Sequence, residues 1–324
     1  MDDTGTIRLG LHEHMPAEAY FGQPFLGSTA IKTAAVDSVA HHLARREKDL
    51  TRAQRMGQIA HSAILEPGVL ETRCVVAECG QCQARTSKGA QCSRNAVPGT
   101  NHCHQHGGNE EAELWLASLP PGTEVVTEDE LAKARETAEG VRAAVARSDY
   151  PGLLDGGQRE VSVFARAILT DEPPGYRLTI EGDEGLLVCG RFDLLYADLH
   201  AIIDVKGAGQ TSMLAQRRWS WRIEDYGLHV QAAIYTDLGR VALGLQPEED
   251  MHFTWLAHEQ DKPHAARFYD ACQKDIVSGR SAVAVGLRRW KHYFNTKDPW
   301  AGWPRSRETV SRPGYVRDDD PEEV

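Results

Sequence analysis

The sequence predicts an α/β fold in which helices flank a central mixed β-sheet, and a small metal-binding module is inserted ahead of the sheet. Two observations lead to this prediction. Apolar segments with the alternation of strands are grouped from residue 159 onward, and helical patterns lie before, between and after them. A segment rich in cysteine, histidine and glycine interrupts the first helical part. Helices, three strands, helix, strand and helix, in that order, are typical of a sheet covered by helices.

Helices are expected on both sides of the cysteine-rich segment. Ser28 can cap a first helix, and a longer helical pattern runs from about Ala53 to Leu65. Two more helices are expected over Glu111–Leu119 and Thr127–Ser148. The second begins with a capping box, in which Glu130 follows Thr127 by three positions.

The strands are expected to begin at Arg159. Segments 159–169, 186–198 and 200–206 are rich in apolar and β-branched residues, and a polar turn at Ala197–His200 joins the last two. The patterns then predict a helix over Trp219–Leu238, a strand over 251–259 and a helix over Lys262–Ser278. These elements divide the chain into an N-terminal helical part (1–77), the inserted module (78–110), the core (111–300) and a C-terminal tail (301–324).

The composition restricts the class of protein. The 324 residues include no run of about 18 apolar residues, and the N-terminus lacks the layout of a secretory signal. We therefore expect a cytoplasmic protein with no membrane partner. The net charge of −11 counts against a protein that coats nucleic acid nonspecifically. It is compatible with a nuclease, because a metal site needs carboxylates and the basic residues can line one channel.

The stretch GRFDLLYADLHAIIDVK, residues 190–206, carries the strongest chemical signal. Asp193 lies in one predicted strand and Asp204 near the end of the next, so a hairpin can bring both carboxylates to one end. Lys206 follows Asp204 by two positions and leaves the same face of the strand. Carboxylates hold Mg²⁺ or Mn²⁺, the metal acidifies a bound water, and a lysine can orient that water or stabilise phosphoryl charge. This set predicts metal-dependent hydrolysis of phosphodiester bonds.

A simpler interpretation of the short D-x-K pattern is a solvated hairpin face with an ion pair between Asp204 and Lys206. Asp204, however, ends the apolar run AII. A charge in such a place needs a partner or a metal, because an isolated buried charge is costly. This position favours the metal site over the solvated face.

The stretch resembles the active-site core of the PD-(D/E)xK nuclease superfamily, which implies a restriction-endonuclease-like fold. MGQIAHSAILEP at 56–67 is similar to the helix that supplies a metal-binding histidine in the RecB-like branch, here His61. Glu160 stands where that branch often has a glutamate entering the first core strand. YGLHVQAAIYTD at 226–237 is similar to the next helix, and the resemblance implies that Gln231 and Tyr235 face the active site or DNA.

The resemblance implies one divalent ion bound by His61, Asp193 and Asp204. The backbone carbonyl of Val205 is expected as a further ligand, because hard cations accept peptide oxygens and Val205 lies between the two motif side chains. For Glu160, a direct metal role and a structural role are equally good explanations. For Tyr235, core packing explains the residue almost as well as function does.

The stretches MPAEAYFGQPFLGSTAIK and WKHYFNTKDPWAGWP also look like the exodeoxyribonuclease VIII (RecE-like) phage recombination family. That resemblance implies Mg²⁺-dependent 5′-to-3′ digestion of double-stranded DNA ends, which supplies single strands to an annealing protein, and it leaves room for a homo-oligomer. The alternative is a DNA-binding or assembly protein that keeps the nuclease fold and uses the inserted module to recognise a partner.

The inserted segment is expected to bind structural Zn²⁺. Cys82, Cys92, Cys103 and His106 are separated by nine, ten and two residues, and three thiolates with an imidazole make a closed tetrahedral site. The segment resembles a short zinc-ribbon-like motif of bacterial and phage proteins. It has few apolar residues, so metal binding is expected to supply most of its folding energy. Cys79, which forms a CxxC pair with Cys82, is an alternative ligand.

Other interpretations of this cluster stay open at this stage. His102 or His104 can replace His106, and the cysteines can be reduced residues of a loop. An iron–sulfur cluster occurs in CRISPR-associated nucleases of the superfamily, but there the cysteines lie on both sides of the core. Here all four precede the core and a histidine joins them, which favours zinc.

Two segments interleave basic and aromatic residues, RRW at 217–219 and LRRWKHY at 287–293. Such a pattern suits contact with a nucleic-acid backbone together with base stacking. The edges of amphipathic helices produce the same pattern, so both explanations are kept. The sequence has no glycine-rich P-loop, and we expect no ATP-driven motor in this chain.

Overall fold

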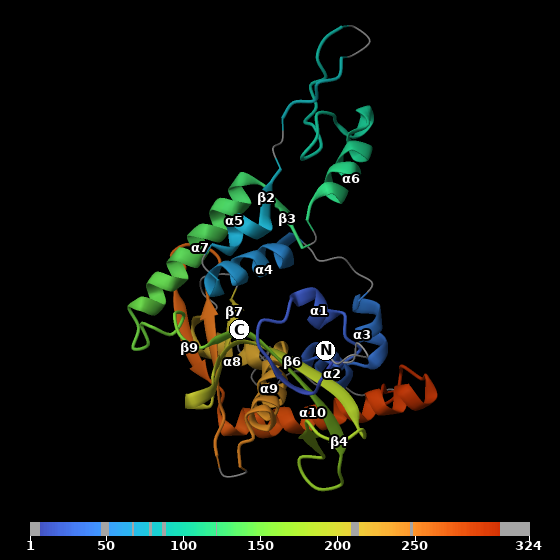
Figure 1. Ribbon diagram of the computed structural model, residues 1–324, viewed down its shortest axis with the longest axis vertical. Helices are drawn as coiled ribbons and strands as arrows, with labels where there is room; N and C mark the ends of the chain where they lie inside the picture. Colours follow the sequence, from blue (N-terminus) through green and yellow to red (C-terminus); the bar gives the residue numbers. More distant parts are fainter. Residues whose placement is uncertain are drawn as a thin grey trace, which may run out of the picture.

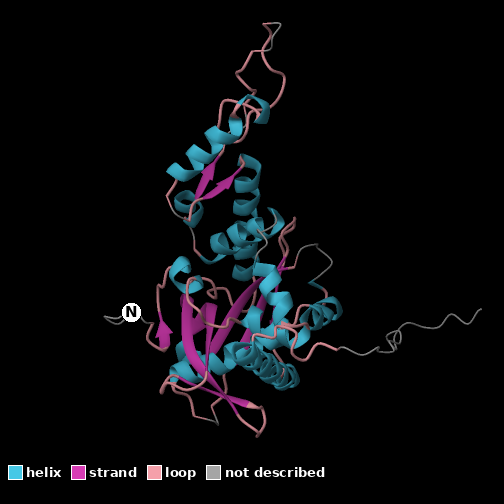
Figure 2. Ribbon diagram, turned by 90° about the vertical axis from the view of Figure 1, so that its right-hand side faces the viewer, coloured by secondary structure: helices cyan, strands magenta, loops and turns pink. Residues whose placement is uncertain are grey.

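A mixed sheet of seven strands forms the centre of the structure and has helices on both faces, as predicted (Figures 1 and 2). The computed structural model describes residues 7–46, 52–66, 68–77, 80–85, 89–120, 122–208, 214–246 and 249–304. The strands of this sheet are β1 (Gly10–His12), β4 (Gln158–Leu169), β5 (Tyr176–Thr179), β6 (Leu186–Tyr196), β7 (Ala201–Gly207), β8 (His252–His258) and β9 (Ala266–Asp270). They follow the order β1-β4-β6-β7-β8-β9, with β5 on β4. Among these described strands only β7 and β8 run parallel, which makes the sheet mixed.

The helices are α1 (Ala17–Phe21), α2 (Ser28–Val36), α3 (Val39–Arg46), α4 (Arg52–Leu65), α5 (Val69–Arg73), α6 (Gly108–Ser118), α7 (Glu128–Ala146), α8 (Gln216–Asp225), α9 (Leu228–Leu243) and α10 (Gln273–Thr296). α2, α9 and α10 pack on one face of the sheet, and α4 and α7 pack on the other. β7 shows the alternation that this requires: Ile202 belongs to the first cluster, whereas Ile203 and Val205 belong to the second. In the part of the chain that the structure describes, no helix is both long and apolar enough to cross a membrane.

A second, two-stranded parallel sheet joins β2 (Cys74–Val76) to β3 (Glu124–Val126). The chain between these strands projects away from the main sheet, as Figures 1 and 2 show, and carries the short helix η1 (His104–His106) and α6. Trp115 of α6 packs on Gly99, where an added Cβ would lie 2.4 Å from the indole ring. α6 therefore lies beside the cysteine segment. The four predicted domain ranges stay predictions.

Several local predictions are confirmed. α7 begins with the capping box: the Glu130 N–H donates to the Thr127 hydroxyl (3.2 Å), and the Thr127 N–H donates to the Glu130 carboxylate (2.8 Å). β4, β6 and β7 occupy the three segments predicted as strands, and the short helix η2 (Ala197–Leu199) forms the predicted turn. These elements depend on local signals, which act through contacts within a few residues.

Two helix predictions need correction. The helix predicted over Trp219–Leu238 is two helices, α8 and α9, because Gly227 has φ +56 and turns the chain between them. The helix predicted over Lys262–Ser278 begins only at Gln273 and continues to Thr296. Its first part is the strand β9, which pairs with β8 and is held there by tertiary contacts that the local pattern does not contain.

Two smaller differences concern chain positions near the N-terminus and at the sheet edge. Gly27 is the residue before α2, and Ser28 is the first helical residue, with no side-chain cap at this end. The strands β1 and β5 were not predicted, since each is short and depends on pairing with β4.

A partly buried ion pair fastens α9 to α10. The Arg280 guanidinium donates to Asp237 at 2.6 Å, and the Tyr176 hydroxyl of β5 donates to the other carboxylate oxygen at 2.5 Å. Removing one member of a buried pair leaves an uncompensated charge, which costs more than the loss of an exposed pair.

We expect Asp237→Ala to lower the free energy of unfolding by about 3 kcal/mol, because Arg280 and Tyr176 both lose their partner. The matched control is Asp261→Ala, which removes an ion pair with Lys133 (2.8 Å) whose side chains are 55% and 59% exposed, and which we expect to cost less than about 1 kcal/mol. Denaturant unfolding measures both values, and equal losses in the two variants would contradict this account of the α9–α10 contact.

Candidate active site and zinc site

Three carboxyl residues lie in one row across neighbouring strands of the main sheet. In the pairing of β4 with β6, the pairs Arg159–Leu194 and Val161–Phe192 lie on either side of Glu160 and Asp193, and these two residues are not themselves paired. The ladder between β6 and β7 ends with the pair Leu194–Ile203, and Asp193 and Asp204 are the next residues beyond this pair. The hairpin therefore brings its two carboxylates together at the point where its strands separate, as the sequence predicts.

The Asp193 carboxylate occupies the space between the separating strands. Its Oδ2 accepts a hydrogen bond from the Val205 N–H at 2.6 Å, and this N–H is therefore not available for pairing between the strands. The same oxygen lies 2.9 Å from Nε2 of His61, which α4 brings from the opposite layer. One oxygen of Asp193, a residue of β6, therefore contacts both the backbone of β7 and a side chain of α4.

Asp204 and Lys206 lie on the face of β7 that packs against α9. The Lys206 ammonium lies 2.8 Å from Oδ1 and 2.7 Å from Oδ2 of Asp204. Gln231 of α9 donates to the same carboxylate at 3.0 Å. Tyr235, one turn further along α9, is buried and packs on Phe192 with ring centroids 5.2 Å apart. Burial and the nearby Asp204 carboxylate raise the pKa of Tyr235 to about 12, so this residue borders the site as well as the core, and its functional role stays a prediction.

Burial and neighbouring charges set the protonation of this site. Burial raises the pKa of Asp204 to about 6, with Asp193 adding to the effect and Lys206 opposing it. Burial disfavours the Lys206 ammonium, but Asp204 and Asp193 outweigh it and raise the pKa of Lys206 to about 12. Burial likewise opposes charge on Asp193, yet His61 and Lys206 hold its pKa below the ordinary value. Lys206 is therefore a cation at neutral pH. Its positive charge stabilises the ionised forms of Asp204 and Asp193, and additional positive charge would stabilise them further.

Glu160 is held in an unusual backbone conformation. Its φ of +52 is uncommon for a residue with a side chain and costs about 1–3 kcal/mol where the surrounding structure maintains it. The Arg191 guanidinium of β6 donates to the Glu160 carboxylate and also to the Met15 carbonyl, at 2.9 Å in the second case. Such local strain is concentrated at functional sites.

The donor atoms fit a divalent metal ion. Ligand atoms of His61, Glu160 and Asp193 lie within 4.8 Å of one another. Oδ2 of Asp204 is buried and lies 2.7 Å from the Lys206 ammonium, so its charge already has a cationic partner. The close group contains Glu160 beside the predicted His61 and Asp193. The roles of Asp204 and of the Val205 carbonyl as ligands stay predictions.

Two basic residues of the site were not predicted. Arg191 precedes Asp193 by two positions in the same strand, so the spacing that identified Lys206 could have identified it as well. Lys32 of α2 is different. Burial, Lys206 and Arg45 together lower its pKa to about 8, so its ammonium lies near that of Lys206, but no sequence signal connects α2 with β7.

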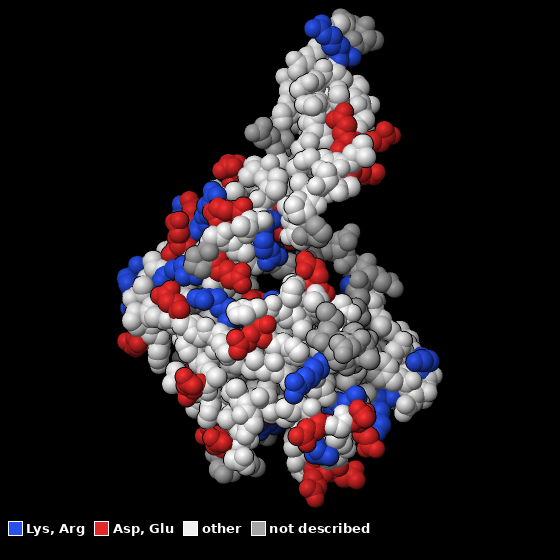
Figure 3. Space-filling view, in the orientation of Figure 1, with Lys and Arg blue, Asp and Glu red and all other residues white. Residues whose placement is uncertain are grey.

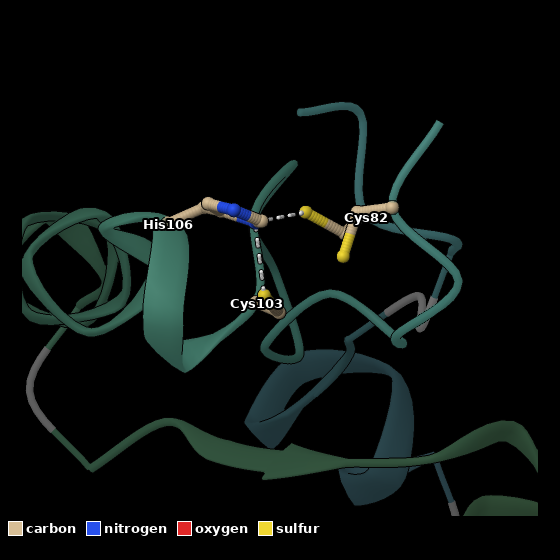
Figure 4. Close-up of side chains that lie close together, drawn as sticks. Cys82, Cys103 and His106 are labelled. Carbon is tan, nitrogen blue, oxygen red and sulfur yellow. Dashed lines mark hydrogen bonds between the residues drawn. The ribbon is translucent and has the colours of Figure 1, made fainter. Parts of the chain in front are cut away.

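The cysteine cluster forms a compact group of four donors. Ligand atoms of Cys82, Cys92, Cys103 and His106 lie within 4.8 Å of one another, and the three cysteines are buried. Nδ1 of His106 is 3.4 Å from the Cys82 sulfur and 3.3 Å from that of Cys103 (Figure 4). Ligand atoms of a tetrahedral zinc site lie about 3.6 Å apart, given Zn–S and Zn–N bonds of about 2.3 and 2.1 Å. The four residues are therefore suited to hold Zn²⁺.

The alternative histidines have other partners. His102 contacts Glu111 at 2.5 Å, and His104 contacts Asn109. His106 is the histidine of the predicted set that lies among the thiols. Cys79 lies outside the described residues, so its place as an alternative ligand stays a prediction.

The two segments with basic and aromatic residues have structural roles at their central tryptophans. Trp219 is 1% exposed and stacks on Tyr269. Trp290 is 4% exposed and donates to the Ala30 carbonyl at 3.0 Å. Both rings belong to the core, so the nucleic-acid interpretation does not hold for these two residues.

Comparisons with known proteins bear on the fold. No family model matches the chain, and no curated protein matches it in sequence. Among solved structures, the crystal structure of a "putative exonuclease" from Eubacterium rectale is similar, with a TM-score of 0.50 and 12% identity over 93% of this chain and 97% of that chain. At this identity the likeness shows a shared fold over nearly the whole length of both proteins.

We expect the purified protein to contain one zinc per chain, and Cys92→Ser to lose it. Because the cysteine segment has its own small cluster of buried residues apart from the main core, loss of the metal should disorder this segment while the main sheet stays folded. Elemental analysis measures the metal, and limited proteolysis locates the disorder. Iron in place of zinc, or no metal in protein purified without chelator, would contradict the assignment.

Proposed function

We propose that this protein is a metal-dependent deoxyribonuclease. The observation that supports this most directly is the row of Glu160, Asp193 and Asp204, with His61 and Lys206 in contact with it. Carboxylates that face a histidine and a lysine are the donor set for a divalent ion beside a phosphate. The fold that this chain shares with a protein described as an exonuclease is consistent with the proposal.

Each residue has a defined task in the proposed reaction. His61, Asp193 and Asp204 would hold Mg²⁺ or Mn²⁺, with Glu160 beside them, and the bound metal would polarise the phosphate and acidify a water. Lys206 is an ammonium at neutral pH, since its pKa is raised to about 12, so it stabilises negative charge on the phosphoryl oxygens and does not act as a base. Gln231 holds the Asp204 carboxylate in place from α9.

The finer substrate assignment depends on the resemblance to the RecE-like family. We propose that the enzyme is an exonuclease that digests linear double-stranded DNA ends in phage-type recombination, with a single-strand annealing protein as partner.

The zinc site takes no part in the chemistry, because four protein ligands leave no open position for water. Basic and acidic side chains are interspersed over the face in Figure 3, and no basic patch is gathered there; the net charge is −11.

We expect Asp204→Asn and Lys206→Ala each to lower the rate of DNA cleavage by about 100-fold or more, because each removes a charge that acts in the transition state. The matched control is Asp198→Asn, an exposed carboxylate in the turn of the same hairpin. The Asp198→Asn variant should cleave DNA at the wild-type rate. Cleavage at near wild-type rate by either site variant would refute the active-site assignment.

The exonuclease assignment has its own test. Linear duplex labelled at the 5′ or the 3′ end is incubated with Mg²⁺ beside a covalently closed circle. We expect the linear DNA to be digested from one end and the circle to stay intact, because an exonuclease needs a terminus. Digestion of the circle would show an endonuclease. No cleavage of any DNA, with retained DNA binding, would favour the assembly protein instead.

A further inference from the structure

The carboxamide of Gln260 lies at the end of β7, between two glycines. A Cβ added to Gly207 would lie 2.9 Å from Nε2 of Gln260, and a Cβ added to Gly57 would lie 3.5 Å from the same atom. Gly207 follows Lys206 directly in β7, and Gly57 is in α4, four positions before His61. Residues four apart share one face of a helix, so the amide lies beside the helix face that carries His61.

This amide and His61 reach the carboxylate site from the same side of the sheet. Gly207 shares a strand face with Val205, two positions before it, and Val205 belongs to the cluster that packs with α4. Gly207 also pairs with His258 of β8, and Gln260 follows two residues later. Burial and, to a smaller extent, the charge of His61 lower the pKa of His258 to about 4, so the end of β8 lies near His61.

The segment that carries Gln260 is held by α7. The Gln260 carbonyl accepts a hydrogen bond from the buried Thr137 hydroxyl at 3.3 Å. His264, which is also buried, packs on Gly140, where an added Cβ would lie 2.5 Å from the His264 Cβ. Within the ranges that the structure describes, no residue forms a hydrogen bond with the Gln260 carboxamide. The backbone is thus fixed while the polar end of the side chain is available to a ligand.

We infer that Gln260 contacts the substrate, and that its side-chain N–H groups donate to a phosphate oxygen of the DNA strand at the metal site. This inference rests on the proposed function, because it needs DNA beside the carboxylates. The glycines at 57 and 207 let the amide lie directly against α4 and β7, close to His61 and Lys206. A carboxamide nitrogen carries two N–H donors, which phosphate oxygens accept.

A neutral donor suits the charge of this site. Lys206 already supplies a cation, and burial together with Lys206 lowers the pKa of the nearby Lys32 to about 8. A further ammonium beside Lys206 is therefore disfavoured, whereas an amide can contact phosphate without this repulsion. Contacts to phosphate carry no sequence information, which suits an enzyme that removes nucleotides of any sequence.

The test compares the kinetics of the wild type and of Gln260→Met, which keeps the length of the side chain and removes its donors. Cleavage of linear duplex DNA with Mg²⁺ gives KM and kcat. We expect KM to rise about tenfold, the lower end of the effect of losing a hydrogen bond to a charged group, with a smaller change in kcat. Gln260→Glu adds a negative charge and should raise KM further. The rise should be equal on A·T-rich and G·C-rich duplexes.

The matched control is Gln273→Glu, the same change of charge at an exposed residue that begins α10, on the other face of the sheet. We expect this variant to keep the wild-type KM. If Gln260 only fills space between α4 and β7, Gln260→Met fills the same space and also keeps the wild-type KM. Unchanged KM in Gln260→Met, an equal rise in Gln273→Glu, or a rise confined to one base composition would overturn the inference.

Binding of fluorescein-labelled duplex without divalent ions, measured by anisotropy, separates this inference from the proposed function. A wild type that cuts DNA, with the same KM in Gln260→Met, would refute the Gln260 contact alone. A protein that cuts no DNA but binds it, about tenfold more weakly as Gln260→Met, would refute the nuclease and retain the contact. A protein that cuts no DNA and binds it equally well in both forms, or not at all, would refute both.

Discussion

Placing three carboxyl residues side by side in the sheet is the constraint on which the rest of the structure depends. Such a row is stable only if positive charge or hydrogen-bond donors reach each oxygen. The structure meets this need from several elements. α4 supplies His61 to Asp193, β7 supplies the Val205 N–H and Lys206, and α9 supplies Gln231 to Asp204. The layers on the two faces of the sheet therefore meet at the carboxylates, and a divalent ion would supply the remaining positive charge.

The two candidate metal sites are stabilised in different ways. The carboxylate site lies between two hydrophobic clusters that fold the surrounding elements without a metal. The cysteine site lies in a projecting segment whose cluster of buried residues consists of the three cysteines, with Ala84 packed against them. Loss of the first metal should therefore stop chemistry and leave the fold intact, whereas loss of the second should affect local folding. Inserting the segment between β2 and β3 keeps this dependence away from the main sheet.

The sequence identified those parts of the site that depend on local spacing. Two-residue periodicity placed Lys206 beside Asp204, and the hairpin placed Asp193 beside both. It could not identify Lys32, because α2 reaches the site only through tertiary packing. It also could not show that Glu160 adopts a positive φ or that β9 replaces part of a helix. These features depend on contacts between distant segments, and a local pattern does not contain them.

The most direct test of the central claim is the position of a bound Mn²⁺ in crystals of the wild-type protein and of Asp193→Asn. An anomalous difference map locates the ion without reference to activity. This account predicts one peak at coordination distance from His61 Nε2 and the Asp193 carboxylate in the wild type. It predicts a weak or absent peak in the variant, because a hard cation prefers a charged oxygen to an amide. A wild-type map with no peak beside these residues, or a peak that is unchanged in Asp193→Asn, would contradict it.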